Sequence, residues 1–99
     1  MQTRETRFDC NVMAKISFQG KTLDCVISNI STGGVSCFLS FKGFLKIGQN
    51  VNVFAMNSNL PLGNVRWIEA CERGYRFGLE FNKQIMRSTV NQFKDTYDK

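Results

Sequence analysis

The chain has 99 residues, of which 42% are hydrophobic and 12% aromatic, so it can build one core but has little length for a second domain. Thirteen Lys and Arg against eight Asp and Glu give a formal net charge of +5, which favours an anionic partner. Histidine and Cys-x-x-Cys spacing are absent, which excludes the usual zinc sites, and the lack of an apolar leader or spanning segment predicts a cytoplasmic protein without membrane insertion.

The chain begins with a segment that differs in composition from the rest. Residues 1–9 are polar and show no periodicity, and we expect them to form a flexible arm that carries Arg4 and Arg7. From Cys10 onward apolar residues recur regularly. We therefore assign 10–99 to a single folded domain.

Six segments alternate apolar and polar residues, which is the pattern of half-buried strands. The predicted strands span 10–18, 22–30, 35–41, 49–56, 62–71 and 75–81. Short polar turns are expected at 20–21, 57–59 and 72–74. In the fifth strand, Val65 and Trp67 are two residues apart and are expected on the same side.

The period changes after the sixth predicted strand. Met86, Val90, Phe93 and Tyr97 recur at spacings of four, three and four, which predicts an amphipathic helix over about 83–97. We interpret this helix as a lid on an open end of the sheet. The predicted fold class is therefore all-β, a small six-stranded antiparallel barrel with a C-terminal α-helix.

The segment between the second and third strands is the most distinctive in the chain. Asn29 and Ser31 point to the same side of an extended backbone because they are two residues apart. Gly33 and Gly34 permit a positive φ, or the close approach of a group that a Cβ would block. Such a polar shelf is suited to an anionic ligand rich in hydrogen-bonding edges, although an ordinary turn between two strands has the same composition.

Binding chemistry fits the sequence better than catalysis does. Without histidine, a general base would have to be a tuned carboxylate, Lys or Cys, and the carboxylates are scattered. We therefore predict no catalytic residues and no metal site. Arginine grips phosphates and guanine edges through its rigid fork of donors. The one tryptophan, Trp67, either stacks on a ligand base or fills the core.

A family resemblance covers almost the whole chain. Residues 29–34, Asn-Ile-Ser-Thr-Gly-Gly, match the (D/N)xSxxG pattern of PilZ domains, which are bacterial receptors for cyclic di-GMP. The segment 46–49 before a Val-rich strand resembles the family's entry to its fourth strand. Segments 65–67 and 74–81 resemble its closing strands. The resemblance implies a six-stranded barrel, consistent with the strand count.

The resemblance also implies roles for single residues of the shelf. Asn29 and Ser31 would contact guanine and phosphate, and Gly34 would leave room for the ligand. The predicted ligand-binding residues are Arg4, Arg7, Asn29, Ser31, Gly33, Gly34 and Trp67, and no cofactor is expected besides the ligand, cyclic di-GMP.

The arm departs from the family's RxxxR pattern. Arg7 fits the second arginine, but Thr3 stands four residues before it, and the nearest arginine is Arg4 at a spacing of three. If Arg4 does not reach the ligand, one charge-assisted hydrogen bond is lost, at a cost of about 1.5–3 kcal/mol.

Two hypotheses of function follow. In the first, the chain is a cyclic di-GMP receptor or adaptor whose N-terminal arm orders over the nucleotide, and which signals through an unidentified protein partner in motility or biofilm formation. In the alternative, it is a degenerate PilZ domain that binds no nucleotide and acts as a protein-interaction module. Non-specific nucleic-acid binding ranks last, because the positive charges are dispersed.

Overall fold

The computed structural model describes residues 6–40 and 45–96. This range contains seven strands and one helix. In chain order they are β1 Phe8–Phe18, β2 Lys21–Ser31, β3 Gly34–Leu39, β4 Asn50–Ala55, β5 Ser58–Asn59, β6 Gly63–Cys71, β7 Gly74–Phe81 and α1 Arg87–Lys94. Three predicted positions, Arg4, Phe41 and Tyr97, lie outside the described residues.

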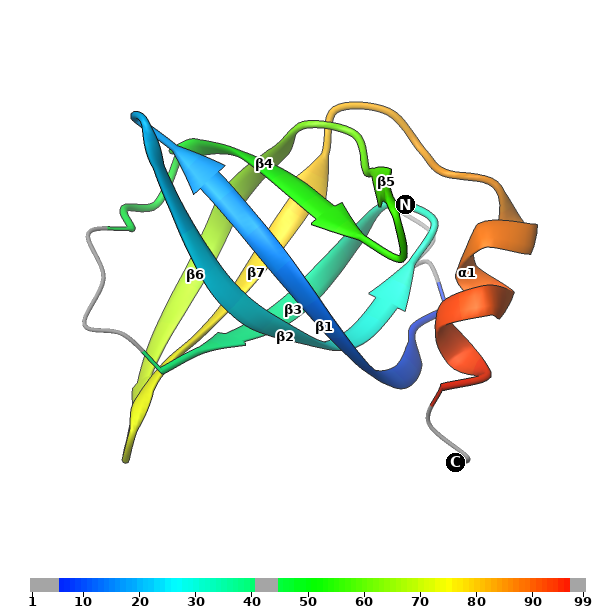
Figure 1. The fold of residues 1–99 in the computed structure, drawn as a ribbon, viewed down its shortest axis with the longest axis horizontal. Coiled ribbons are helices and arrows are strands. Elements are labelled where there is room, and N and C mark those ends of the chain that lie inside the picture. The colour runs from blue at the N-terminus through cyan, green and yellow to red at the C-terminus, as the bar shows by residue number, and fades with distance from the viewer. Residues whose placement is uncertain (1–5, 41–44, 97–99) are drawn as a thin grey trace, which may run out of the picture.

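Six of the strands form a closed antiparallel ring (Figure 1). The hydrogen-bonded order is β1-β2-β3-β7-β6-β4, and β4 pairs back with β1 between Ala14–Ala55 and Ser17–Asn52. The two-residue strand β5 pairs only with β4 among the described strands. The predicted six-stranded antiparallel barrel with a C-terminal helix is therefore confirmed, and β5 is an addition that the sequence pattern did not indicate.

Two hairpin turns lie one residue earlier than the sequence pattern predicted. The first consists of Gln19 and Gly20, with φ of 50° and 75°, and the second of Met56 and Asn57, with φ of 52° and 62°. Two consecutive positive φ angles give a turn whose twist matches that of the flanking strands. Because the second turn is this tight, Ser58–Asn59 folds back as β5 instead of forming part of the turn.

The core fills the barrel with every second residue of the strands. All five apolar residues predicted to share a face of β1 are buried, from Cys10 to Phe18. β2, β3, β4, β6 and β7 also contribute buried apolar residues, although β6 contributes none after Val65, and α1 adds Val90 and Phe93, each 1% exposed. The buried members of this core are Cys10, Val12, Ala14, Ile16, Phe18, Cys25, Ile27, Ile30, Val35, Cys37, Leu39, Val51, Val53, Ala55, Leu60, Val65, Phe77, Leu79, Phe81, Val90 and Phe93.

Helix α1 covers one end of the barrel, against β1 and β2 (Figure 1). It begins at Arg87, four residues later than the predicted start, and Met86 is its N-cap with a side chain that is 71% exposed. The prediction of Met86 in the buried stripe is therefore wrong. Ile85 packs against the core instead, and its backbone N–H donates to the carbonyl oxygen of Thr32, so this segment runs along the β2–β3 turn rather than forming helix.

Candidate ligand-binding surface

Five residues from five strands form one row across the outside of the barrel. The pairing runs from Asp9 in β1 to Asn29 in β2, then to Ser36 in β3, Gly78 in β7 and Trp67 in β6. Successive side chains of a strand alternate between faces. The core contains Ile30, which follows Asn29, and both neighbours of Ser36 and of Gly78, namely Val35, Cys37, Phe77 and Leu79. The row therefore faces outward and brings Asn29 and Trp67 onto one surface.

Arg7 is the residue immediately before β1, and its side chain reaches this row. One guanidinium nitrogen, Nη1, donates to Asn29 Oδ1 at 2.7 Å and lies 3.5 Å from Ser36 Oγ. The structure thus brings together two of the predicted ligand residues that are 22 positions apart in the sequence. Ser36 was not predicted, although it is a hydroxyl residue at an outward position of a strand whose inward positions are apolar.

Ser31 lies on the same outward side as Asn29, as predicted, but its side chain is buried. It is 3% exposed, and its hydroxyl oxygen accepts a hydrogen bond from the N–H of Gly33 at 3.2 Å. The hydroxyl also donates to the carbonyl oxygen of Gly34 at 3.5 Å. The carbonyl of Gly33 in turn accepts from the N–H of Phe81 at 2.8 Å. Ser31 and Gly33 therefore hold the β2–β3 turn in place against the end of β7.

Gly34 provides a close approach between strands. It is buried, and a Cβ at this position would overlap the carbonyl oxygen of Leu79 in β7. The sequence left two reasons for a glycine here, a positive φ or the close approach of another group. Gly34 does not have a positive φ, so the structure supports the close approach. The group that approaches is the backbone of β7, and the ligand space that the resemblance implies at Gly34 stays a prediction.

Trp67 lies outside the barrel, so the predicted common side for Val65 and Trp67 is wrong. Val65 is fully buried, whereas Trp67 is 39% exposed. The register with β7 shifts between these two residues, so that Arg66 is the extra residue of a bulge and the alternation reverses. The alternative in which Trp67 fills the core is excluded, because its indole lies over Gly78 on the outer face.

The row is flanked by an ion pair, and the buried polar side chains beneath it have hydrogen-bond partners within the protein. Arg66 Nη2 lies 2.7 Å from Glu80 Oε1, in an exposed ion pair next to Trp67. Among the described residues, no buried side-chain nitrogen or oxygen lacks a hydrogen-bond partner.

Cys10, which follows Asp9 of the row, is buried, and this burial together with the Asp9 charge raises the pKa of its thiol to about 11. The thiol beneath this surface is therefore neutral at physiological pH.

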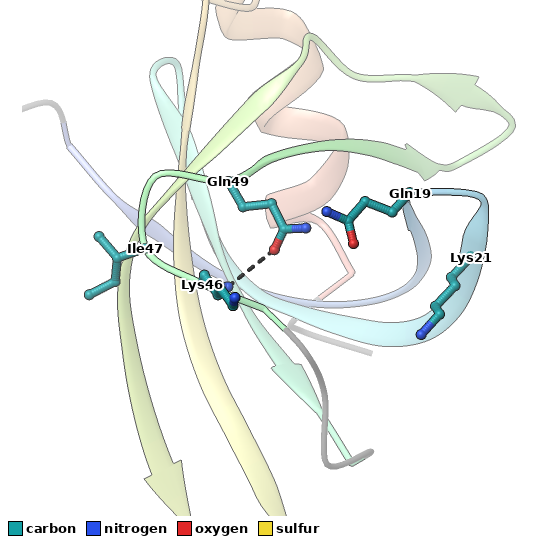
Figure 2. Close-up of a pocket in the computed structure, with 5 residues that line it drawn as sticks. All are labelled: Gln19, Lys21, Lys46, Ile47 and Gln49. Atoms are coloured by element: carbon teal, nitrogen blue, oxygen red, sulfur yellow. Dashed lines mark hydrogen bonds between the residues drawn. The ribbon is translucent and has the colours of Figure 1, made fainter.

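A separate pocket of about 520 Å³ lies near the other end of β1. Figure 2 shows the five side chains that line it, Gln19, Lys21, Lys46, Ile47 and Gln49. Gln49 Oε1 accepts a hydrogen bond from the backbone N–H of Lys46 at 3.1 Å. None of the predicted ligand residues lines this pocket, so it is distinct from the outward row. Its lysines provide control positions for experiments on that row.

Comparison with known proteins gives a family and a fold. The family profile described as PilZ domain matches residues 2–95. The solved structure of the Bacillus subtilis inhibitor of motility, MotI/DgrA, is similar with a TM-score of 0.72 and 15% sequence identity. The match covers 96% of this chain and 49% of that one, so this chain spans about half the length of that protein. No curated protein sequence matches. Within the described range, no helix has the length and apolar character needed to cross a bilayer.

Proposed function

Because the chain belongs to the PilZ domain family, whose members are non-catalytic receptors for cyclic di-GMP, we propose that it binds cyclic di-GMP on the outward row. The observation that carries this proposal is the position of Arg7. Its guanidinium lies 2.7 Å from the carboxamide of Asn29 and beside the hydroxyl of Ser36, on the surface that the family motif marks.

The chemistry of these side chains fits a guanine dinucleotide. A guanidinium has five N–H donors, so Arg7 keeps donors for a phosphate or for guanine O6 and N7 while one contacts Asn29. The carboxamide of Asn29 offers both a donor and an acceptor to a base edge. Ser31 contributes by holding the turn, and contact of its hydroxyl with the ligand would require that its hydrogen bond to Gly33 open.

The output is proposed to pass through a protein partner. Arg7 directly precedes β1, and the start of β1 touches the end of α1, where Asn11 N–H donates to Thr96 Oγ1 at 3.0 Å. The ring of Phe8 lies 4.8 Å from the ammonium of Lys94. Phe8 and Asp9 of the predicted arm 1–9 already belong to β1. Ordering of the rest of the arm, including Arg4, over the nucleotide would therefore change the surface shared by β1 and α1. A cytoplasmic role in motility or biofilm formation is consistent with the similarity in fold to an inhibitor of motility.

The degenerate interaction module remains the second candidate, because of two observations. The hydroxyl of Ser31 is buried and already engaged within the turn, and Thr3 replaces the first arginine of the family's arm pattern. In this candidate the shelf is a packed hairpin end and binds no nucleotide.

Calorimetric titration with cyclic di-GMP distinguishes the two candidates. We expect saturable binding by the wild type and about a ten- to hundredfold loss of affinity in Arg7→Ala, because a charge-assisted hydrogen bond is removed. Lys46→Ala is the matched control, since it removes one positive charge at the remote pocket, and it should bind like the wild type. No saturable heat from the wild type would rule out the receptor and favour the interaction module.

A further inference from the structure

The pocket of about 520 Å³ near the β1–β2 turn lies between two tight turns of the chain (Figure 2). Gln19 belongs to the turn between β1 and β2, and Lys21 is the first residue of β2. Lys46, Ile47 and Gln49 come from the segment that leads into β4. The volume lies within the range of small-molecule pockets, and the five described residues that line it include two lysines, two glutamines and no carboxylate.

The turn that leads into β4 is fixed in place by hydrogen bonds. The N–H of Gln49 donates to the carbonyl oxygen of Lys46 at 3.0 Å, and Gly48 has φ of 91°, the conformation of the third residue in a type II turn. The turn is also tied to β6. The N–H of Gly48 donates to the carbonyl oxygen of Val65 at 2.7 Å, and the side-chain amide of Asn64 donates to the carbonyl oxygen of Gly48 at 2.7 Å. This wall of the pocket is therefore preformed, which favours affinity for a ligand.

The same turn orients the carboxamide of Gln49. Its Oε1 accepts a hydrogen bond from the backbone N–H of Lys46 at 3.1 Å, which leaves the NH₂ group to face the pocket. Figure 2 shows the carboxamides of Gln49 and Gln19 turned toward one another, with their nitrogen atoms nearest. Two NH₂ groups are both donors and cannot hydrogen-bond to each other, whereas an acceptor between them would be bound by both.

Positive charge flanks these two amides. Figure 2 shows Lys46 on the side of Gln49 and Lys21 on the side of Gln19. Neither of the ion pairs between described residues involves Lys46. An ammonium group is a compact charge with three donors and no acceptor. The side chains around the pocket therefore offer hydrogen-bond donors and positive charge, which is the chemistry of an anion site.

We propose that this pocket binds a phosphate group that carries two negative charges, either inorganic phosphate or a phosphate monoester. The two lysines match the charge of such a group near neutral pH, whereas each phosphate of cyclic di-GMP is a diester with a single charge. The inference goes beyond the proposed function and does not rest on it, because the pocket shares no residue with the outward row.

Nuclear magnetic resonance titration of the isotope-labelled protein tests the site, with inorganic phosphate and adenosine monophosphate as the probes. We expect a saturable shift of the side-chain NH₂ signals of Gln19 and Gln49 with at least one probe, and the probe that binds more tightly identifies the source of the phosphate. Uncharged adenosine should leave these signals unchanged. No saturable shift with either probe at millimolar concentrations, or an equal shift with adenosine, would overturn the proposal.

Gln49→Glu is the sharpest variant. A carboxylate oxygen can still accept the N–H of Lys46, so the turn is retained, but the donor that faces the pocket is replaced by a negative charge. Affinity for phosphate should fall by more than about tenfold. Lys46→Gln removes one exposed charge and should weaken binding about two- to fivefold. The matched control, Lys83→Gln, removes the same charge between β7 and α1 and should bind phosphate like the wild type.

The outcomes separate this site from the proposed function. Arg7→Ala should leave phosphate binding unchanged, and Lys46→Gln should leave cyclic di-GMP binding unchanged. Equal losses of phosphate affinity in Lys46→Gln and Lys83→Gln would show only an attraction to net positive charge and would overturn the site. If Gln49→Glu does not fold, the comparison of these two lysine variants decides alone. Absence of cyclic di-GMP binding by the wild type would refute the receptor and leave the phosphate site standing.

Discussion

At the scale of single residues, the two polar positions of the motif do different work. Asn29 and Ser31 share the outward side of β2, but only Asn29 presents its side chain to a residue from another segment, Arg7. The hydroxyl of Ser31 forms hydrogen bonds with the backbone of Gly33 and Gly34 in the turn that follows it. A residue pattern of this kind thus encodes both a contact surface and the hairpin that holds it.

Ser31→Ala should lower the free energy of unfolding by about 1–3 kcal/mol, since it leaves the N–H of Gly33 without its acceptor. Urea unfolding monitored by circular dichroism measures this change. Ser88→Ala on the exposed face of α1 is the control, and it should alter stability by less than about 0.5 kcal/mol. Equal stability of Ser31→Ala and the wild type would show that the hydroxyl does not support the turn.

At the scale of elements, the C-terminal helix shows how hydrophobic spacing locates a helix without defining its start. Met86 continues the apolar stripe of Val90 and Phe93 at helical spacing, yet it is an exposed N-cap. Ile85 donates its backbone N–H to the carbonyl oxygen of Thr32 in the β2–β3 turn, and Met86 has an extended backbone with φ of −72° and ψ of 150°, so the helix begins only at Arg87. A hydrogen bond to a distant segment thus overrides the local pattern.

Phe93→Ala and Met86→Ala should therefore differ greatly in effect. Phe93 is 1% exposed, and its truncation should cost about 3–5 kcal/mol through lost burial and the cavity left behind. Met86 is 71% exposed, and its truncation should change stability by less than about 0.5 kcal/mol. Denaturant midpoints of the two variants test this, and a cost for Met86→Ala comparable to that of Phe93→Ala would contradict the observed helix start.

At the scale of the whole molecule, closure of the barrel buries three of the four cysteines and changes the pKa values of their thiols. Cys10, Cys25 and Cys37 are buried within the ring, and Cys71 is partly exposed near the β6–β7 turn. Burial, with the nearby Asp9 charge, raises the pKa of Cys10 to about 11. A hydrogen bond with Cys25, and complete burial, raise the pKa of Cys37 well above its ordinary value. The folded barrel therefore favours the neutral form of the Cys10 and Cys37 thiols.

This predicts a loss of stability in alkaline solution. Because the pKa of Cys10 is about 11 in the folded protein against 9.0 for the ordinary thiol, its contribution is fully present below pH 9 and is lost as the pH rises toward 11. The melting temperature of the wild type should fall more steeply over this range than that of Cys10→Ala. Parallel curves for the two proteins would show that the Cys10 thiol has the same pKa in both states.

The fold was largely determined by the sequence itself. The two-residue alternation from Cys10 to Phe18, and in the later strands, is a local property of an extended backbone. It predicted the six strands correctly and their buried faces as well, except at Trp67, where a bulge reverses the alternation. It misplaced the turns at Gln19–Gly20 and Met56–Asn57 by one residue, because positive φ angles leave no trace in hydrophobic periodicity. The family motif at residues 29–34 also located the β2–β3 hairpin correctly, because the motif is a continuous stretch of sequence and can be recognised without knowledge of the fold.

Only the tertiary structure decided how the candidate surface is assembled. The meeting of Arg7 with Asn29, the outward turn of Trp67 and its place over Gly78 all depend on contacts with segments distant in the sequence. The bulge at Arg66 exists only relative to the register of β7, and the need for glycine at Gly34 arises from the backbone of that same strand. The chain encodes these features, but they become readable only when the strands are paired, because register and close approach are properties of two strands and not of one.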